Sequence, residues 1–97
     1  MFTIHDYSVE EIKDPTGILA GHRFEYILNL EVDEEDELFL DDGVSLRVIL
    51  AVEGNHARIS QYTFHNRSTN AYLDFGLEED EEEMILSFCM EHISEAE

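Results

Sequence analysis

Two stretches in which apolar residues recur at every second position stand out along the chain, residues 24–32 and residues 44–52. Because successive side chains of a β-strand point to opposite faces, both stretches predict strands with one strongly apolar face. An acidic segment at residues 33–42 separates them and is interrupted by Leu38-Phe39-Leu40. We expect this connection to be a solvated loop.

The N-terminal segment alternates less regularly. Phe2 and Ile4 are apolar in one frame, whereas Tyr7 and Val9 are apolar in the other. A one-residue change of frame moves every following side chain to the other face of a sheet. The change near His5-Asp6 therefore predicts either a β-bulge or two short strands.

Turn signatures and weaker strands complete the β pattern. Asp14-Pro15-Thr16-Gly17 predicts a β-turn, because Pro fixes φ and Gly relieves strain. Glu53-Gly54-Asn55-His56 predicts a tight hairpin turn. It leads into a strand at about residues 58–65, and a short extended segment at residues 71–75 is a candidate edge strand.

From about Leu77 the apolar residues adopt spacings of three, four and seven, which place them on one face of a helix. This stripe comprises Leu77, Met84, Ile85, Phe88, Cys89 and His92 or Ile93. The sheet has an apolar face and the helix an apolar stripe, so each can cover the other. We predict an α+β fold, a single domain over residues 1–97, with a twisted antiparallel sheet of four or five strands and one C-terminal helix packed on its apolar face.

A formal net charge of −19 on 97 residues limits the partners of such a domain. Of the 24 Asp and Glu residues, 12 fall within residues 31–37 and 78–83, and only five Lys and Arg oppose them. This surface repels nucleic acid and anionic membranes, and it attracts cations and basic proteins. We therefore expect no direct nucleic-acid partner and no membrane association. At 43% apolar residues, the chain can still build a core, unlike a disordered acidic tail.

The cellular compartment is predicted from cysteine usage and from the apolar runs. Cys89 is the single cysteine, which rules out an internal disulfide and suits a reducing compartment. The N-terminal residues lack the cationic start and long apolar run of a signal peptide. The longest apolar run, residues 48–52, is too short to span a bilayer. We expect a cytoplasmic protein.

The acidic blocks have two interpretations. Acids in the first turns of a helix are stabilised by its macrodipole, by roughly 0.3–1 kcal/mol each, which accounts for only part of the second block. Solubility is a sufficient reason for the remainder. The alternative is a contact surface for a basic protein partner, formed by Asp33, Glu34, Glu35, Asp36, Glu37, Glu78, Glu79, Asp80, Glu82 and Glu83.

Arrangements typical of metal sites and enzymes are missing from the sequence. The acidic segment has no central Gly such as an EF-hand loop requires, and the five histidines show no HxH or HxxxH spacing. No nucleophile elbow, P-loop or dinucleotide-binding glycine pattern occurs. We therefore assign no catalytic, metal-binding or cofactor-binding residue. Two function classes stay open: a non-catalytic acidic interaction or regulatory module, and a small ligand-binding domain or enzyme with its site among polar strand residues and the acidic loop.

A small apolar patch interrupts the polar face of the two best strands. If these strands pair in register, Ile27, Ile49 and Ala51 come together. The charged residues around them are Arg23, Glu25, Arg47 and Glu53. Such a patch is either ordinary exposed apolar surface or a contact surface for self-association or a partner. We expect a monomer or a weak homodimer.

Three stretches carry a resemblance to a known family: residues 7–15 (YSVEEIKDP), residues 72–75 (YLDF), and Phe88-Cys89 with Glu91-His92. Together with the chain length, they resemble a family of small acidic, uncharacterised proteins from Gram-positive, bacillus-like bacteria. The resemblance implies a bacterial cytosolic protein of unassigned function. It brings no catalytic or binding residues with it.

Overall fold

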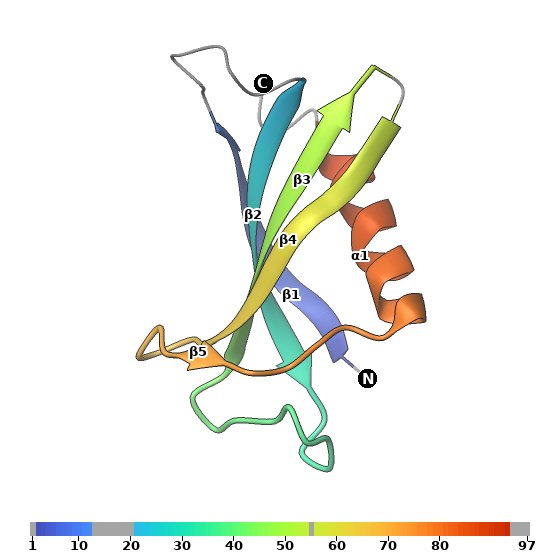
Figure 1. The fold of residues 1–97 in the computed structure, drawn as a ribbon. Coiled ribbons are helices and arrows are strands. Elements are labelled where there is room, and N and C mark those ends of the chain that lie inside the picture. The colour runs from blue at the N-terminus through green and yellow to red at the C-terminus, as the bar shows by residue number, and fades with distance from the viewer. Residues whose placement is uncertain (1, 13–20, 55, 94–97) are drawn as a thin grey trace.

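Five strands and one helix make up the computed structural model, which describes residues 2–12, 21–54 and 56–93. Their bounds are β1 (Phe2–Ile12), β2 (His22–Val32), β3 (Val44–Glu53), β4 (His56–Asn66), β5 (Tyr72–Leu73) and α1 (Glu79–His92). Each strand pairs antiparallel with the next one in the chain, so the sheet has the order β1-β2-β3-β4-β5 (Figure 1). The predicted α+β fold is confirmed. The predicted turn at residues 14–17, and Asn55 of the predicted hairpin turn, lie outside the described residues.

The register of the sheet follows the apolar alternation. Phe24 pairs with Leu50, so the apolar positions of β2 and β3 share one face. The register of β1 against β2 shifts between Ile4 and Asp6, which confirms the predicted bulge and leaves β1 as one strand. A second register shift, between Ile49 and Leu50 of β3 and their partners in β4, was not predicted.

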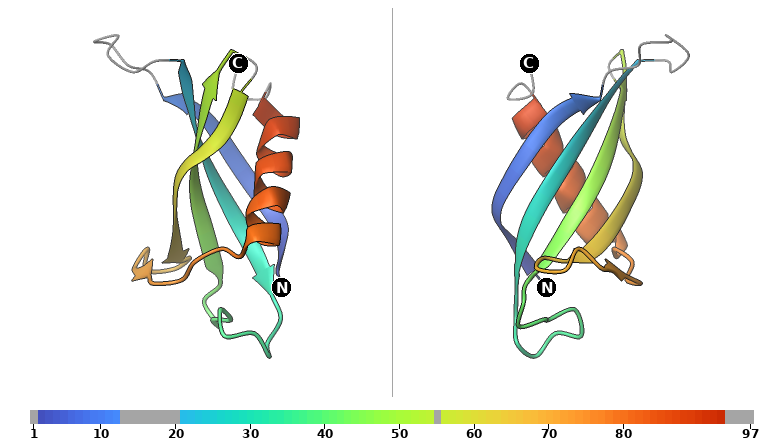
Figure 2. Two further views of the ribbon diagram at one scale, coloured as in Figure 1. Left: turned by 45° about the vertical axis from the view of Figure 1, so that its right-hand side comes forward. Right: turned by 90° about the vertical axis from the view of Figure 1, so that its left-hand side faces the viewer.

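The core lies between the sheet and α1. Figure 2 shows the helix running along one face of the twisted sheet, while the opposite face carries no other described element. Ile85 and Cys89 are the fully buried helix residues, and they pack on the apolar face of β2, β3 and β4. The Tyr26 hydroxyl reaches across from β2 and donates a hydrogen bond to the Cys89 carbonyl oxygen at 2.6 Å.

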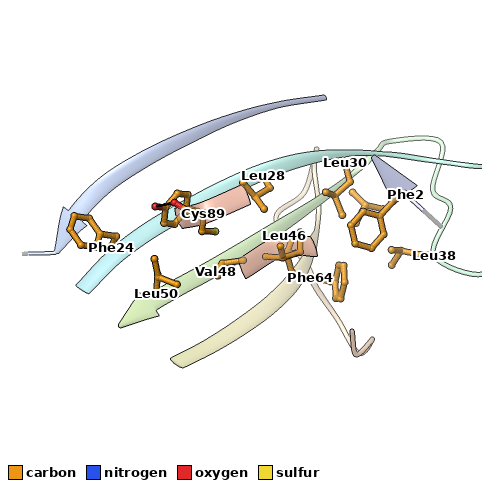
Figure 3. Packing of buried hydrophobic residues seen from close by; sticks show 13 residues of the cluster. Phe2, Phe24, Leu28, Leu30, Leu38, Leu46, Val48, Leu50, Phe64 and Cys89 are labelled. Atoms are coloured by element: carbon orange, nitrogen blue, oxygen red, sulfur yellow. Dashed lines mark hydrogen bonds between the residues drawn. The ribbon is translucent and has the colours of Figure 1, made fainter. Parts of the chain in front are cut away.

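The acidic loop between β2 and β3 is not wholly solvated, and this corrects the expectation from the sequence. Leu38 is buried in the core beside Phe2 and Phe64, as Figure 3 shows at one end of the cluster. The Leu38 N–H donates to the Asp36 carboxylate at 3.0 Å, which fixes the backbone immediately before the buried side chain. The part of the loop around Leu38 is therefore held against one end of the sheet.

Candidate binding site between the acidic loop and the helix N-terminus

The two acidic blocks, far apart in sequence, meet at one end of the sheet. The β2–β3 loop lies at this end, and the segment after β5 crosses it to reach the start of α1 (Figure 1). A hollow of about 400 Å³ lies between them and is lined by residues of both blocks. Five carboxylates and no cationic side chain are among the described residues that line this hollow, and it is the candidate binding site.

Apolar side chains line part of the hollow: Phe2, Leu38, Phe64 and Phe75. Phe64 is buried, whereas Phe75 is 40% exposed. The two rings meet edge to face with centroids 6.4 Å apart. The segment that carries Phe75 is held in place by the Leu77 N–H, which donates to the Tyr62 hydroxyl at 2.8 Å.

Carboxylates also line the hollow, from the loop and from the first turn of α1: Asp36, Glu37, Glu78, Asp80 and Glu81. The hydrogen bond from the Leu38 N–H lowers the pKa of Asp36, so this carboxyl stays ionised at neutral pH. Neither Glu37 nor Asp80 forms an ion pair with any residue that the structure describes. The hollow therefore presents negative charge beside apolar surface.

Part of the second acidic block has a structural role, as the sequence predicted for the helix start. Glu78 is the N-cap residue, and it forms a reciprocal capping box with Glu81. The Glu78 N–H donates to the Glu81 carboxylate at 2.9 Å. Such a box satisfies backbone donors that the first turn leaves without intrahelical partners. Asp80 lies in the same turn, where the macrodipole favours negative charge.

The structure divides the predicted partner surface. Four of the ten residues predicted for this surface line the hollow: Asp36, Glu37, Glu78 and Asp80. Three others, Glu79, Glu82 and Glu83, line a separate shallow groove between β4 and α1. Arg58 also lines this groove. Glu34 lies on a third, small depression beside β2 and β3, and Asp33 and Glu35 are exposed loop residues.

Sequence reasoning missed Glu81 and the four apolar residues of the hollow. The only sequence signal for them was the interruption of the acidic segment by Leu38-Phe39-Leu40 and the lone Phe75 close before the second block. Their contribution depends on the fold of the β2–β3 loop and on the path of the chain after β5. Neither can be read from local spacing.

The predicted apolar patch lies on the face of the sheet opposite α1. The register places Ile49 beside Glu25, Ala51 beside Arg23, and Ile27 beside Arg47, so the expected ring of charges is present. An ion pair of 2.6 Å joins Arg47 to Glu25 at the edge of the patch. Ile49 and Ala51 are only 7% and 3% exposed. They offer little surface, and the role of the patch in self-association stays a prediction.

Three histidines form side-chain hydrogen bonds within the part of the chain that the structure describes. His92 shares a hydrogen bond of 2.9 Å with the Tyr7 hydroxyl, His22 contacts the Glu11 carboxylate at 2.9 Å, and His65 contacts the Thr63 hydroxyl at 2.7 Å. Within the described ranges, no three His, Cys, Asp or Glu side chains are grouped so that they could hold a metal ion.

The thiol of Cys89 is buried under the sheet, and burial raises its pKa from 9.0 to about 12. It is therefore protonated near neutral pH and is a poor nucleophile there. This agrees with the inert, buried cysteine that the apolar stripe predicts.

The fold and its surface define a small acidic α+β protein, an open antiparallel sheet covered on one face by one helix. The chain belongs to a family of unknown function, DUF6509, whose sequence profile matches residues 2–96. No curated protein and no solved structure shows significant similarity to the chain. Among the described residues, α1 is the sole helix, and it is neither long nor apolar enough to cross a membrane.

Proposed function

We propose that this protein is a non-catalytic interaction or regulatory module of the cytoplasm that binds a basic protein partner through the acidic end of its sheet. One observation carries the proposal: two acidic blocks that are distant in sequence line a single hollow. The protein acts as a monomer or a weak homodimer, and the patch of Ile27, Ile49 and Ala51 is the surface through which copies would associate.

The clustering of carboxylates around the hollow favours a role as a contact surface over a role in solubility alone. Solubility requires net charge, but it does not require carboxylates to converge. Convergence raises their mutual repulsion and so lowers the stability of the folded state. It also creates a local negative potential, which accelerates encounter with a positively charged protein and selects against acidic ones.

The volume of the hollow supports a second candidate, a small cationic ligand. About 400 Å³ lies within the range of roughly 300–1,000 Å³ that ligand pockets occupy. Such a ligand would compete with the basic protein for the same carboxylates. Competition between the two would identify one shared site.

Affinity capture with paired variants tests the proposal. The double variant Glu37→Gln, Asp80→Asn removes two charges at the hollow, and the control Glu10→Gln, Glu91→Gln removes two exposed charges elsewhere. A basic protein should be captured from cytosol by the wild type and by the control, should be lost from the hollow variant, and should elute with salt. Equal loss from both variants, or no basic protein at all, would contradict the proposal.

A further inference from the structure

The hollow combines two chemical features that few side chains satisfy together. Its carboxylates include Glu37 of the β2–β3 loop and Asp80 of the first turn of α1. Its apolar lining ends in Phe75, whose ring keeps 40% of its surface exposed while the Phe64 ring behind it is buried. The exposed part of Phe75 does not contribute to the packing of the core, so it is available for contact with another molecule.

The contrast with the neighbouring groove shows which charge the hollow lacks. In the groove between β4 and α1, Arg58 of the chain itself stands among Glu79, Glu82 and Glu83. The hollow has no Lys, Arg or His among the described residues that line it. Charge complementarity therefore favours the hollow, rather than the groove, as the binding site for a cationic group of another molecule.

Among cationic side chains, the guanidinium of arginine fits both features. It is planar and weakly hydrated, so it stacks on an aromatic ring, and its N–H groups form paired hydrogen bonds with carboxylates. An ammonium group is a compact, strongly hydrated point charge that uses the carboxylates but gains less from the ring. Arginine is also among the residues that most often dominate the energetics of interfaces.

We propose that the hollow receives an arginine side chain of the basic partner, with the guanidinium against Phe75 and its N–H groups donating to Glu37 and Asp80. This inference rests on the proposed function and adds the side chain that the partner must present. Lysine-rich segments of equal charge bind the same end of the molecule more weakly.

Two peptides of equal charge, octa-arginine and octa-lysine, provide the test. Their affinities for the wild type are measured by fluorescence anisotropy at low and at moderate salt. We expect octa-arginine to bind roughly two- to five-fold more tightly for one stacked guanidinium. Phe75→Leu should reduce this preference, whereas Tyr72→Leu, which removes an aromatic ring that is 62% exposed outside the hollow, should leave it unchanged.

The outcomes separate this inference from the proposed function. Equal binding of both peptides to the wild type, or a preference that survives Phe75→Leu, overturns the arginine inference. The proposed function still stands in that case if Glu37→Gln, Asp80→Asn weakens both peptides more than the control variant does. Failure of both peptides to bind contradicts both. If Phe75→Leu does not fold, the amide chemical shifts of residues 74–78 in the wild type decide. Octa-arginine should move them more than octa-lysine does at equal saturation, and equal movements overturn the arginine inference.

Discussion

At the scale of single residues, the hydroxyl of Tyr26 joins the two layers of the fold. Its ring is fully buried in the sheet, and its hydrogen bond of 2.6 Å ends on the Cys89 carbonyl oxygen in α1. A carbonyl oxygen can accept two hydrogen bonds, so the Cys89 carbonyl gives the buried Tyr26 hydroxyl an acceptor inside the core. The alternation in β2 predicted that Tyr26 is buried, but the partner of its hydroxyl depends on where the helix crosses the sheet.

Replacing Tyr26 with Phe should lower the free energy of unfolding by about 1–2 kcal/mol, because a buried carbonyl loses its donor while the packing is kept. Urea denaturation of both proteins measures the difference. Tyr72→Phe is the control, since that ring is largely exposed and its change should stay within about 0.5 kcal/mol. Equal stability of Tyr26→Phe and wild type would show that the hydrogen bond contributes nothing.

The raised pKa of Cys89 makes stability depend on pH in the alkaline range. The folded state holds the thiol proton up to a pKa of about 12, whereas the unfolded chain releases it near 9.0. The protonated thiol therefore contributes its full stabilisation below pH 9, and this is lost as the pH rises towards 12. Denaturation curves between pH 8 and 11 should show falling stability, with a shallower slope for Cys89→Ala. Parallel slopes for the two proteins would contradict this assignment.

At the scale of elements, changes of apolar frame identify the irregularities of the strands. The change near His5 predicted a bulge or two short strands, and β1 is one strand with the bulge. The same signal occurs in β4, where Ala57 and Ile59 are apolar in one frame and Tyr62 and Phe64 in the other. The register shift there leaves Ser60 without a partner in the ladder, so the sequence held this information although the prediction did not use it. Strand identity and faces were thus predictable from local periodicity.

The candidate site was predictable only in part, because it depends on contacts between distant elements. Clustering of acids identified Glu37 and Asp80 as surface candidates. The candidate edge strand at residues 71–75 is confirmed as the short strand β5. The sequence did not indicate that the chain after it would bring Phe75 next to Phe64. The charge of the site was therefore predictable from the sequence, whereas its shape depends on tertiary packing and was not.

The start of β2 depends on a glycine that no other residue can replace without movement of the backbone. Gly21 has φ +71°, and a Cβ built on it would lie 2.2 Å from the Val52 carbonyl oxygen. Gly21→Ala should cost about 2 kcal/mol or more, because both the φ angle and the contact are unfavourable.

Gly54→Ala is the matched control for this substitution. Gly54 has φ +57°, but a Cβ there would meet no atom within 4 Å. Only the left-handed conformation is penalised, at about 1 kcal/mol. Thermal melts of both variants measure the difference, and equal losses would show that the contact with Val52 relaxes freely.

At the scale of the whole molecule, the net charge of −19 opposes folding. Salt screens repulsion between surface charges, with a Debye length of about 10 Å at 0.1 M. The melting temperature should therefore rise between low salt and about 0.5 M salt, by roughly 4–8 °C for each 1 kcal/mol of relieved repulsion. Glu37→Gln, which removes an exposed loop carboxylate among other acids, should melt higher than wild type at low salt and respond less to added salt. Identical melting curves at both salt concentrations would contradict a repulsive surface.

The open sheet gives this charge a further consequence. β1 is an edge strand of eleven residues, and a long unpaired edge is a template on which a second copy can add its own strand. Asp6, Glu10 and the nearby bulge interrupt that template, and the excess of negative charge keeps two copies apart. High salt screens these charges and so weakens this protection. We therefore expect the same carboxylates that weaken the fold to hinder edge-to-edge pairing of two copies.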